Sequence, residues 1–336
     1  MRYTTQDKLL ALGLLYKSPS AYRFMSRSFC LPSERTLQSY VGDLHVGCGF
    51  KSDYTEALKK RVESMNDFEK HCVLTFDGMS LKAKLNYNEA IDKIRGFVDL
   101  GEYGDHKSEV SKQAIQFMVR GISTKWKQPI GHFFGPNSVS AETLEVMVKD
   151  AVLLLENIGV KVVALVCDQE VTHRLLFKKL GVTVSEPWFV SSKNNKVFAM
   201  YDVPHLVKNL RNNMIDYSIH INGNIASFKH IRQMYDLEKN CTLRLCPKLT
   251  DGHFDLKPFK KMKVCLATQV FSHSVSTAMR TYVKFGQLDE SALQTADFVE
   301  LIDQLFDIMN SRSNVKHKWK KPLTANCLLR QALIEQ

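Results

Sequence analysis

The sequence of 336 residues has no long apolar run, because no stretch reaches the roughly 18 to 20 consecutive apolar residues that a membrane span needs. Its first residues include an apolar patch, but they also include Asp7, Lys8 and Lys17 and have no small-residue cleavage site, unlike a signal peptide. We therefore predict no membrane partner. The 44% apolar and 24% charged residues are those of an ordinary globular protein, and the length suffices for about two domains.

Several nucleotide and hydrolase motifs are also missing, namely G-x-x-x-x-G-K-[ST], G-x-G-x-x-G, G-x-S-x-G and H-E-x-x-H. Any nucleotide site must therefore be built in another way. None of the eight cysteines forms a C-x-x-C pair, which favours a reducing compartment, the cytosol or the nucleus. A zinc site from Cys241, Cys246, His253 and Cys265 fits no common ligand spacing, and we keep it only as a minor alternative.

Acidic residues are too few to balance the basic ones, and the net charge is +11. Residues 193–263 hold 13 Lys and Arg against 6 Asp and Glu, and the run Arg312 to Lys321 has no acid at all. A solvated face explains any one such run. The overall excess favours a polyanionic partner, either nucleic acid or a nucleotide.

Residues 4–41 have the pattern of three short helices. The side chains that we predict to face inward are Leu9, Leu10, Leu14, Leu15, Tyr22, Phe24, Met25, Phe29, Leu37, Tyr40 and Val41. The third helix, after a possible N-cap at Ser33, offers Arg35 and Gln38 on its outer face, as a DNA-binding helix-turn-helix does. A helical cap packed on the next domain explains the same pattern equally well.

From residue 71 the pattern changes to α/β. We predict strands over Val73–Phe76, Ala90–Val98, Ile130–Phe134, Lys161–Cys167 and Val197–Met200, and helices over Ser140–Asn157 and His173–Leu180. Three strands followed by a helix that crosses over to a buried strand is the order of an RNase H-like sheet. Three of these strands end at an aspartate, Asp77, Asp168 or Asp202. We expect these carboxylates to converge at one sheet edge, where open α/β sheets place their sites.

Asp77 and Asp168 predict metal chemistry if they meet. Carboxylates that gather at one point repel each other, and a divalent cation removes the repulsion. Mg²⁺ prefers oxygen ligands and keeps waters for a phosphate substrate. The alternative is that each aspartate merely caps the helix that follows it, and the residues alone favour neither interpretation.

Several blocks of the sequence resemble P-element-type transposases, including their THAP-associated relatives. The blocks are "ALGLLYKSPSAYRFMSRSFCLPSERTL" (11–37), "LTFDGMSLKAKLNYN" (74–88), "VCDQEVTHRLLFKKLGV" (166–182), "DVPHLVKNLRNNM" (202–214), "FSHSVSTAMR" (271–280) and "TADFVELIDQLFDIMNSR" (295–312). The resemblance implies a mixed α/β fold, in which an RNase H-like sheet is interrupted by a mostly helical GTP-binding insertion domain and preceded by a small helix-turn-helix module. It implies the domains 1–45 (helix-turn-helix), 46–70 (linker helix), 71–214 (first part of the catalytic domain) and 215–336 (truncated insertion).

The same resemblance implies an Mg²⁺-dependent DDE transposase of the nucleus that cuts and joins transposon-end DNA, with Asp77 and Asp168 as its first two acids. The third acid, a Glu, lies beyond the insertion in this family, whereas this sequence ends at Gln336. We therefore expect this chain alone not to catalyse transposition. The family's C2CH zinc finger also has no counterpart near the first residue, and Gly78 and His173 replace a common Glu and Asn.

For GTP, the resemblance points to seven positions, namely Lys248, Lys263, Val264, Ser272, Phe306, Asp307 and Asn310. In the block after the last strand, we expect Asp202 and His205 to anchor the join with the insertion through hydrogen bonds. Lys208 and Arg211 are candidates for DNA phosphate contacts. Two other hypotheses stay open, a domesticated and catalytically silent DNA-binding protein and a GTP-binding regulatory module, and so does a homo-oligomer.

Overall fold

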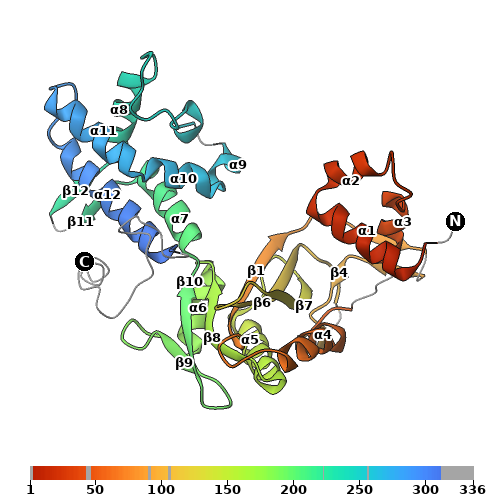
Figure 1. Cartoon of the computed structure of the whole chain (residues 1–336). Coiled ribbons are helices and arrows are strands. Elements are labelled where there is room, and N and C mark those ends of the chain that lie inside the picture. Colours follow the sequence, from red (N-terminus) through yellow and green to blue (C-terminus); the bar gives the residue numbers. More distant parts are fainter. Residues whose placement is uncertain are drawn as a thin grey trace.

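The computed structural model describes residues 3–42, 47–89, 92–104, 107–221, 223–255 and 257–311. Its side chains form three separate hydrophobic clusters, one in the N-terminal helices, one around a central sheet and one in a C-terminal group of helices. Figure 1 shows the sheet between the two helical groups. Within the described part of the chain, no helix has the length and apolar character needed to cross a membrane.

The N-terminal group consists of α1 (Thr5–Lys17), α2 (Pro19–Met25) and α3 (Glu34–Gly42), which confirms the three predicted helices. Thr4 and Asp7 form a capping box at the start of α1. Ala11, Tyr22 and Leu37 make the small buried core, and the Tyr22 hydroxyl donates to the Pro32 carbonyl at 2.5 Å. This cluster is separate from the core of the sheet, and Figure 1 shows the group apart from the sheet, unlike a packed cap.

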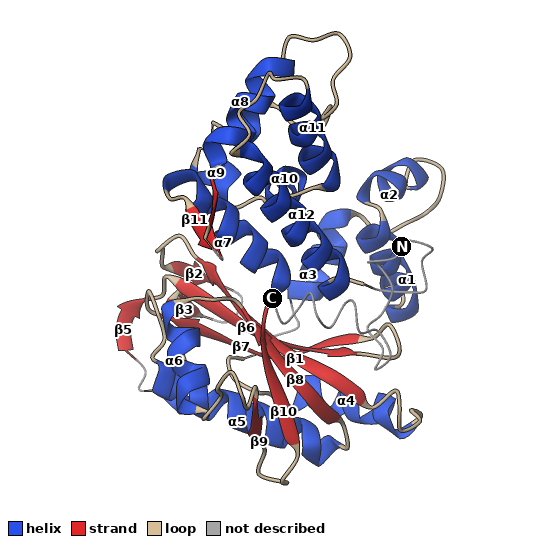
Figure 2. Cartoon of the chain, turned by 90° about the vertical axis from the view of Figure 1, so that its left-hand side faces the viewer, coloured by secondary structure: helices blue, strands red, loops and turns tan. Residues whose placement is uncertain are grey.

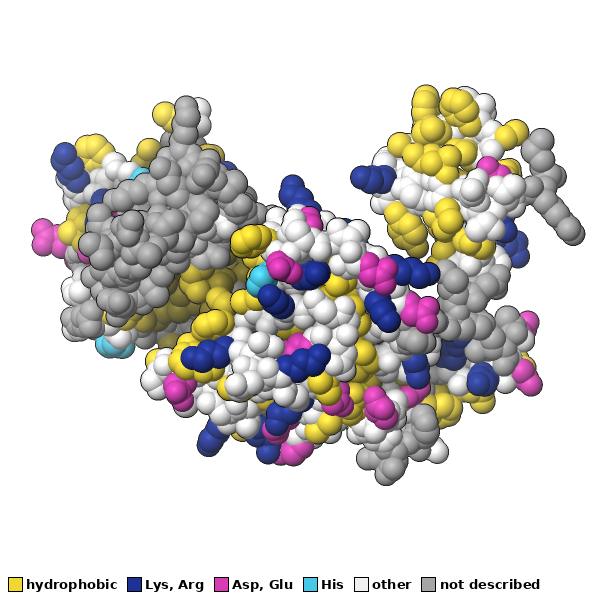
Figure 3. Space-filling view, turned by 60° about the horizontal axis from the view of Figure 1, so that its bottom comes forward, with side chains coloured by type: hydrophobic (Ala, Val, Ile, Leu, Met, Phe, Trp, Pro, Cys, Tyr) yellow, Lys and Arg dark blue, Asp and Glu magenta, His cyan; other side chains and the backbone are white. Residues whose placement is uncertain are grey.

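Part of the predicted inner face of these helices is wrong. Four of these side chains are exposed, namely Leu9, Leu10, Phe24 and Phe29. Three short helices enclose only a small core, and the outer sides of the helices have no further element to pack against. Figure 3 shows hydrophobic side chains gathered on this group of helices.

The central sheet has six strands in the order β7-β6-β1-β8-β10-β9. They are β1 (His71–Ser80), β6 (Gln113–Gly121), β7 (Lys127–Gly135), β8 (Lys161–Cys167), β9 (Trp188–Val190) and β10 (Lys196–Tyr201). β1, β8 and β10 run parallel, while β6, β7 and β9 are antiparallel to their neighbours. Figure 2 shows the helices α4 (Ser52–Glu63), α5 (Ala141–Ile158) and α6 (Val171–Lys179) on one side of this sheet.

The second strand of the sheet is not the predicted one, Ala90–Val98, but β6. Within 90–98 the described residues form two short strands, β3 (Lys93–Arg95) and β4 (Phe97–Val98), which pair with β2 (Asn86–Asn88) and β5 (Lys107–Val110). Gly96, with φ of +111°, separates β3 from β4 and so prevents one continuous strand. β6 alternates buried and less buried residues from Ala114 to Arg120, which is the signal that the prediction missed.

The core of the sheet extends to the helix that precedes it. Leu58 and Val62 of α4 are buried against the sheet, and α5 contributes one long apolar face. α5 starts at the Ser140 cap and ends at Gly159, which adopts a left-handed φ of +93°. α4, the helix within the predicted linker 46–70, therefore packs on the sheet and shares its hydrophobic core.

The C-terminal group is mostly helical, as predicted. It contains α7 (Val203–Asp216), α8 (Phe228–Glu238), α9 (Pro258–Lys261), α10 (Val264–Val270), α11 (His273–Lys284) and α12 (Ala292–Met309), with the hairpin β11 (Ile219–Ile221) and β12 (Asn224–Ala226). Val207 and Met214 place the buried face of α7 in this helical core. The domain limits near residues 45, 70 and 214 remain a prediction, and the basic run 312–321 lies outside the described residues.

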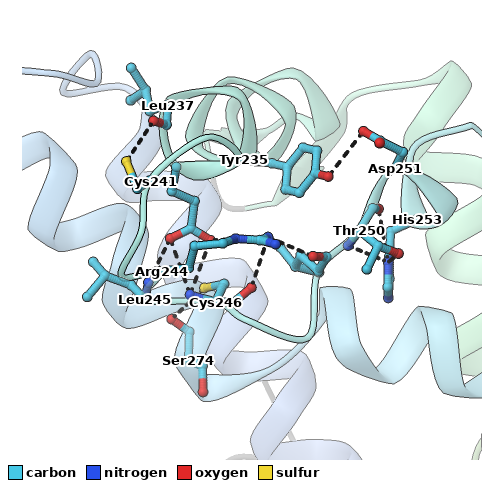
Figure 4. A network of polar contacts seen from close by, with 12 residues as sticks. Tyr235, Leu237, Cys241, Arg244, Leu245, Cys246, Thr250, Asp251, His253 and Ser274 are labelled. Atoms are coloured by element: carbon cyan, nitrogen blue, oxygen red, sulfur yellow. Dashed lines mark hydrogen bonds and ion pairs between the residues drawn. The ribbon is translucent and has the colours of Figure 1, made fainter.

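A buried carboxylate organises the loop between α8 and α10 (Figure 4). Glu238 is fully buried and accepts the backbone N–H groups of Leu245 at 2.9 Å and Cys246 at 3.1 Å. Arg244 lies 3.9 Å from the same carboxylate and donates to the Leu249 carbonyl at 2.6 Å. The loop that carries Lys248 is therefore held by one internal charge rather than by secondary structure.

We predict that Glu238→Ala destabilises the protein by about 2–4 kcal/mol, because it leaves the buried N–H of Cys246 and the part-buried N–H of Leu245 without their acceptor and removes the carboxylate that lies 3.9 Å from Arg244. Chemical denaturation measures this loss. Glu290→Ala, at an exposed position of the same helical group, is the matched control and is expected within about 0.5 kcal/mol of the unmutated chain. Equal effects of the two substitutions would contradict the structural role of Glu238.

Candidate functional site

The three strand-end aspartates lie at one edge of the sheet, as predicted. Thr75 of β1 pairs with Val166 of β8, so Asp77 and Asp168, each two residues later, lie at the same level and on the same face. Tyr201 of β10 pairs with Cys167, and the Asp202 N–H donates to the Cys167 carbonyl at 2.8 Å. The three acids thus lie at the same end of the paired region of three adjacent parallel strands.

One detail of the predicted edge differs. β1 does not end at Asp77 but continues to Ser80, because β6 still pairs with it there. The pairing with β8 stops at Thr75, which leaves the Asp77 side chain exposed on the side of Asp168. Asp77 therefore has both a backbone that is paired with β6 and an exposed carboxylate.

Asp168 is the centre of a small polar cluster. Its Oδ1 lies 2.5 Å from His173 Nδ1 and accepts the Glu170 N–H at 3.1 Å. Ligand atoms of Asp168, Glu170 and His173 lie within 4.8 Å of one another, the one such group of potential metal ligands among the residues described. Burial raises the pKa of Asp168, but the His173 hydrogen bond, the Glu170 N–H and the charges of His173 and His205 outweigh it, so that the pKa lies below its usual value.

This cluster fits a divalent cation. The hydrogen bonds to Asp168 among the described residues all end on Oδ1, and those to Asp77 end on its Oδ1, from the Gly78 N–H at 2.8 Å. The Oδ2 atom of each carboxylate is thus available, and oxygen atoms are the ligands that Mg²⁺ prefers. Asp168 would hold the ion, with Glu170 beside it; Asp77 is not part of this 4.8 Å group but lies on the adjacent strand at the same level, where it would be a further ligand.

Gly78, directly after Asp77, is one departure from the family pattern, and the structure explains it. A Cβ atom on Gly78 would lie 2.3 Å from Gln113 Nε2, so the Gln113 side chain takes the space where the family often has Glu. A pocket of about 10 Å³, enough for about one water molecule, lies here and is lined in part by Gly78, Gln113 and His173.

The sequence left open whether each strand-end aspartate binds a metal or caps the following helix. Asp202 is a helix cap, at the start of α7. Its Oδ2 accepts the His205 N–H at 3.2 Å and lies 2.5 Å from His205 Nδ1. The predicted hydrogen-bonded anchor between the sheet and the insertion is therefore present. Asp168 differs, because α6 begins at Glu170 without a side-chain cap.

The candidate DNA-binding residues have different surroundings. Arg35 and Gln38 are exposed on α3, and Arg35 lines an open hollow of about 370 Å³ together with Lys8 of α1. Lys208 is half-buried on α7. The prediction for Arg211 is wrong, because its side chain is fully buried, with Nε bonded to Asn212 and Nη2 to the Lys261 carbonyl.

The seven nucleotide positions lie at helix ends and in one loop. Lys263 and Val264 start α10, Ser272 precedes α11, and Phe306 and Asp307 lie in the last turn of α12. Asn310 follows α12, and Lys248 is exposed in the loop that Glu238 organises. Both α10 and α12 pack on α7, so these ends lie on one group of helices (Figure 1). Phe306 packs partly against the helical core, as its residue type alone suggests.

The zinc alternative has no support among the described residues. Cys246 donates to the Ser274 carbonyl, and His253 bonds Thr250 and Gln269 with its two ring nitrogens. The sequence analysis missed Glu170. Its signal was the D-Q-E spacing directly after a buried strand, which puts a second carboxylate near the first.

Two family models match the chain. One, described as "TNP-like, RNase H N-terminal domain", matches residues 46–181, and the other, "TNP-like, GTP-binding insertion domain", matches residues 204–322. They confirm the predicted combination of an RNase H-like sheet and an inserted helical domain.

Known proteins with similar sequence and structure agree. The chain is 29% identical over 330 residues to the transposable element P transposase of Drosophila melanogaster, covering 97% of this chain and 40% of that protein. It is 27% identical to the DNA transposase THAP9 of Homo sapiens, covering 96% and 36%. The structure of the Drosophila P element transposase strand transfer complex matches with a TM-score of 0.79 and 28% identity, over 100% of this chain and 72% of that one.

The chain spans about 40% or less of the length of these two relatives. Within that span it has the two domains in the same order, the strand-end acids at one sheet edge and the helical insertion directly after the last parallel strand. The chain therefore belongs to the family of P-element-type transposases.

Proposed function

We propose that this chain acts as the RNase H-like and GTP-binding part of a nuclear DNA transposase that cuts and joins transposon-end DNA with Mg²⁺. The observation that carries the proposal is the alignment of Asp77 and Asp168 on adjacent parallel strands, each with one carboxylate oxygen available. A P transposase and a DNA transposase among its relatives support the same activity.

Bound Mg²⁺ would supply the charge that stabilises the attacking and leaving oxygens of a phosphoryl transfer. The chain's own residues prepare this site. His173 is buried, its ring centroid lies 4.8 Å from that of Phe76 in an edge-to-face arrangement, and it fixes the orientation of Asp168. His205, held by Asp202, adds a polar ring at the same edge.

For the nucleotide, we propose that Lys248 and Lys263 contact phosphates as point charges and that Ser272 and the Val264 backbone add hydrogen bonds. Phe306 would pack on the base, while Asp307 and Asn310 would bond the guanine edge. Asn310, the C-cap of α12, is four residues after Phe306 and three after Asp307, which are the spacings of neighbouring positions on a helix, so one base would lie near all three. GTP is thus the proposed nucleotide.

The hollow between α1 and α3 supports DNA binding by the N-terminal helices. Lys8 and Arg35 line it, together with hydroxyl groups of Ser33, Thr36 and Ser39. Cationic and hydroxyl side chains are typical of phosphate contacts. We propose that α3 lies against DNA through this surface, with Gln38 beside it.

The metal site predicts a graded loss of ion binding. We expect Asp168→Asn to abolish saturable Mn²⁺ binding and His173→Asn to weaken it about tenfold, because His173 only orients the ligand. Titration of the purified chain, followed by electron paramagnetic resonance of free Mn²⁺, measures both. Asp216→Asn, at an exposed position of α7, is the control with no expected change. Unaltered binding by Asp168→Asn would end the metal hypothesis.

The nucleotide site predicts a change in base preference. Removing a carboxylate that accepts two guanine donors costs about 1–3 kcal/mol of discrimination, so Asp307→Ala should bind GTP and ATP equally. Calorimetric titration with both nucleotides tests this. The control is Asp297→Ala, earlier in α12, which removes an exposed ion pair with Arg280 of α11. This variant should keep the preference for GTP. Equal affinity of the unmutated chain for both nucleotides would refute the assignment.

The N-terminal surface predicts salt-dependent DNA binding. Each lost phosphate contact lowers the slope of log K against log salt by about 0.9, so Arg35→Gln should reduce that slope by roughly one. Fluorescence anisotropy at several salt concentrations gives the slopes. Arg27→Gln, at an exposed position outside the hollow, provides the comparison. If both variants keep the original slope, α3 does not contact the DNA backbone.

A further inference from the structure

A short segment of the insertion, residues 257–262, exposes apolar and basic side chains together. Phe259, within the single turn of α9, is 83% exposed, and Met262, directly after that turn, is 68% exposed. Lys257 and Lys261 are exposed beside them, and Lys260 is half-buried. We call this segment the α9 knob, and Figure 1 shows α9 at the margin of the helical group.

The knob is held firmly although its side chains point outward. Arg211 Nη2 donates to the Lys261 carbonyl at 3.2 Å, and Asn212 Nδ2 donates to the same oxygen at 3.3 Å. Both donors belong to α7, and Arg211 is fully buried. The exposure of Phe259 is therefore a property of an anchored backbone rather than of a loose loop.

The charge around the knob is positive and unbalanced. Residues 257–263 contain four lysines and no acid. No ion pair among the described residues involves any of these lysines, and Arg211 has no carboxylate partner there either, with Nη1 lacking any hydrogen bond. Such a surface fits a polyanion, and its exposed aromatic ring fits a partner with flat apolar faces.

Two classes of partner combine negative charge with apolar surface, namely single-stranded DNA and an anionic membrane. The position of the knob favours DNA. α7 runs from Asp202, at the sheet edge with Asp168, to Arg211 beneath the knob, a helical rise of about 14 Å for nine residues. One DNA strand whose phosphate lies at the acids therefore reaches the knob within a few nucleotides.

We propose that the α9 knob binds a single-stranded segment of the DNA substrate, with Lys257, Lys260 and Lys261 on phosphates and Phe259 stacked on an unpaired base. This inference rests on the proposed action on DNA and adds a second contact, separate from α3. Lys263, which starts α10, remains with the nucleotide site.

The test measures binding of the full chain to two labelled DNAs by fluorescence anisotropy, a blunt duplex and the same duplex with a single-stranded 3′ extension. Stacking on one base contributes about 1–3 kcal/mol, so Phe259→Ala should weaken binding to the extended DNA about tenfold and leave the blunt duplex within twofold. Phe285→Ala, which removes a ring 70% exposed in the same helical group, should change neither. Lys257→Gln with Lys260→Gln should lower the salt slope on the extended DNA by roughly 1.4.

The outcomes separate the two proposals. If the unmutated chain binds neither DNA, both the action on DNA and the knob fail. If it binds both DNAs and Phe259→Ala behaves like Phe285→Ala, only the knob assignment fails. Binding of vesicles containing anionic lipid that is lost in Phe259→Ala, with DNA binding unchanged, would assign the knob to a membrane surface and overturn it. Thermal melting of each variant checks that the exposed substitutions leave the fold intact.

Discussion

The parallel pairing of β1, β8 and β10 is the constraint on which the site depends. Because side chains alternate along a strand, a slip of one residue between β1 and β8 would turn Asp77 to the opposite face from Asp168. The observed register, Thr75 with Val166, prevents this, and the buried residues on the other face fix that register. The relative placement of the two proposed metal ligands is thus set by the hydrophobic core, at a distance from the carboxylates themselves.

α7 connects the sheet to the insertion and fixes where the insertion begins. Asp202 ends β10 and caps α7, so the helix starts at a level set by the sheet. Further along, Arg211 and Asn212 hold the backbone before α10, while α12 packs on the same helix. A single helix, α7, therefore contacts the elements that carry the proposed metal site, the nucleotide residues and the α9 knob. These contacts explain how a long insertion can keep a defined position relative to the sheet edge.

The sequence predicted the sheet where strands were apolar and bounded by clear helices, as for β8 between α5 and α6. It failed at β6, where buried and less buried residues alternate from Ala114 to Arg120, and placed the strand at 90–98 instead, although that stretch contains Asp92, Lys93 and Arg95. It also failed for Arg211, because helical spacing shows that a residue lies on a helix but not which later segment will cover it. Lys261, fifty positions away, covers Arg211, and no local pattern contains that information.

The three strand-end carboxylates share one arrangement that local sequence could not show. Asp77 and Asp168 accept hydrogen bonds on Oδ1 and Asp202 on Oδ2, so within the described structure each acid uses one oxygen for the protein and keeps the other available. Two of the three take a histidine as partner, not a lysine or arginine. A lysine or arginine at that position would carry a permanent charge and compete with a metal ion for the carboxylate, whereas a histidine ring orients the carboxylate through a hydrogen bond. At the proposed metal site, histidine side chains therefore orient Asp168 and Asp202, and within the described structure neither acid forms an ion pair with a lysine or arginine.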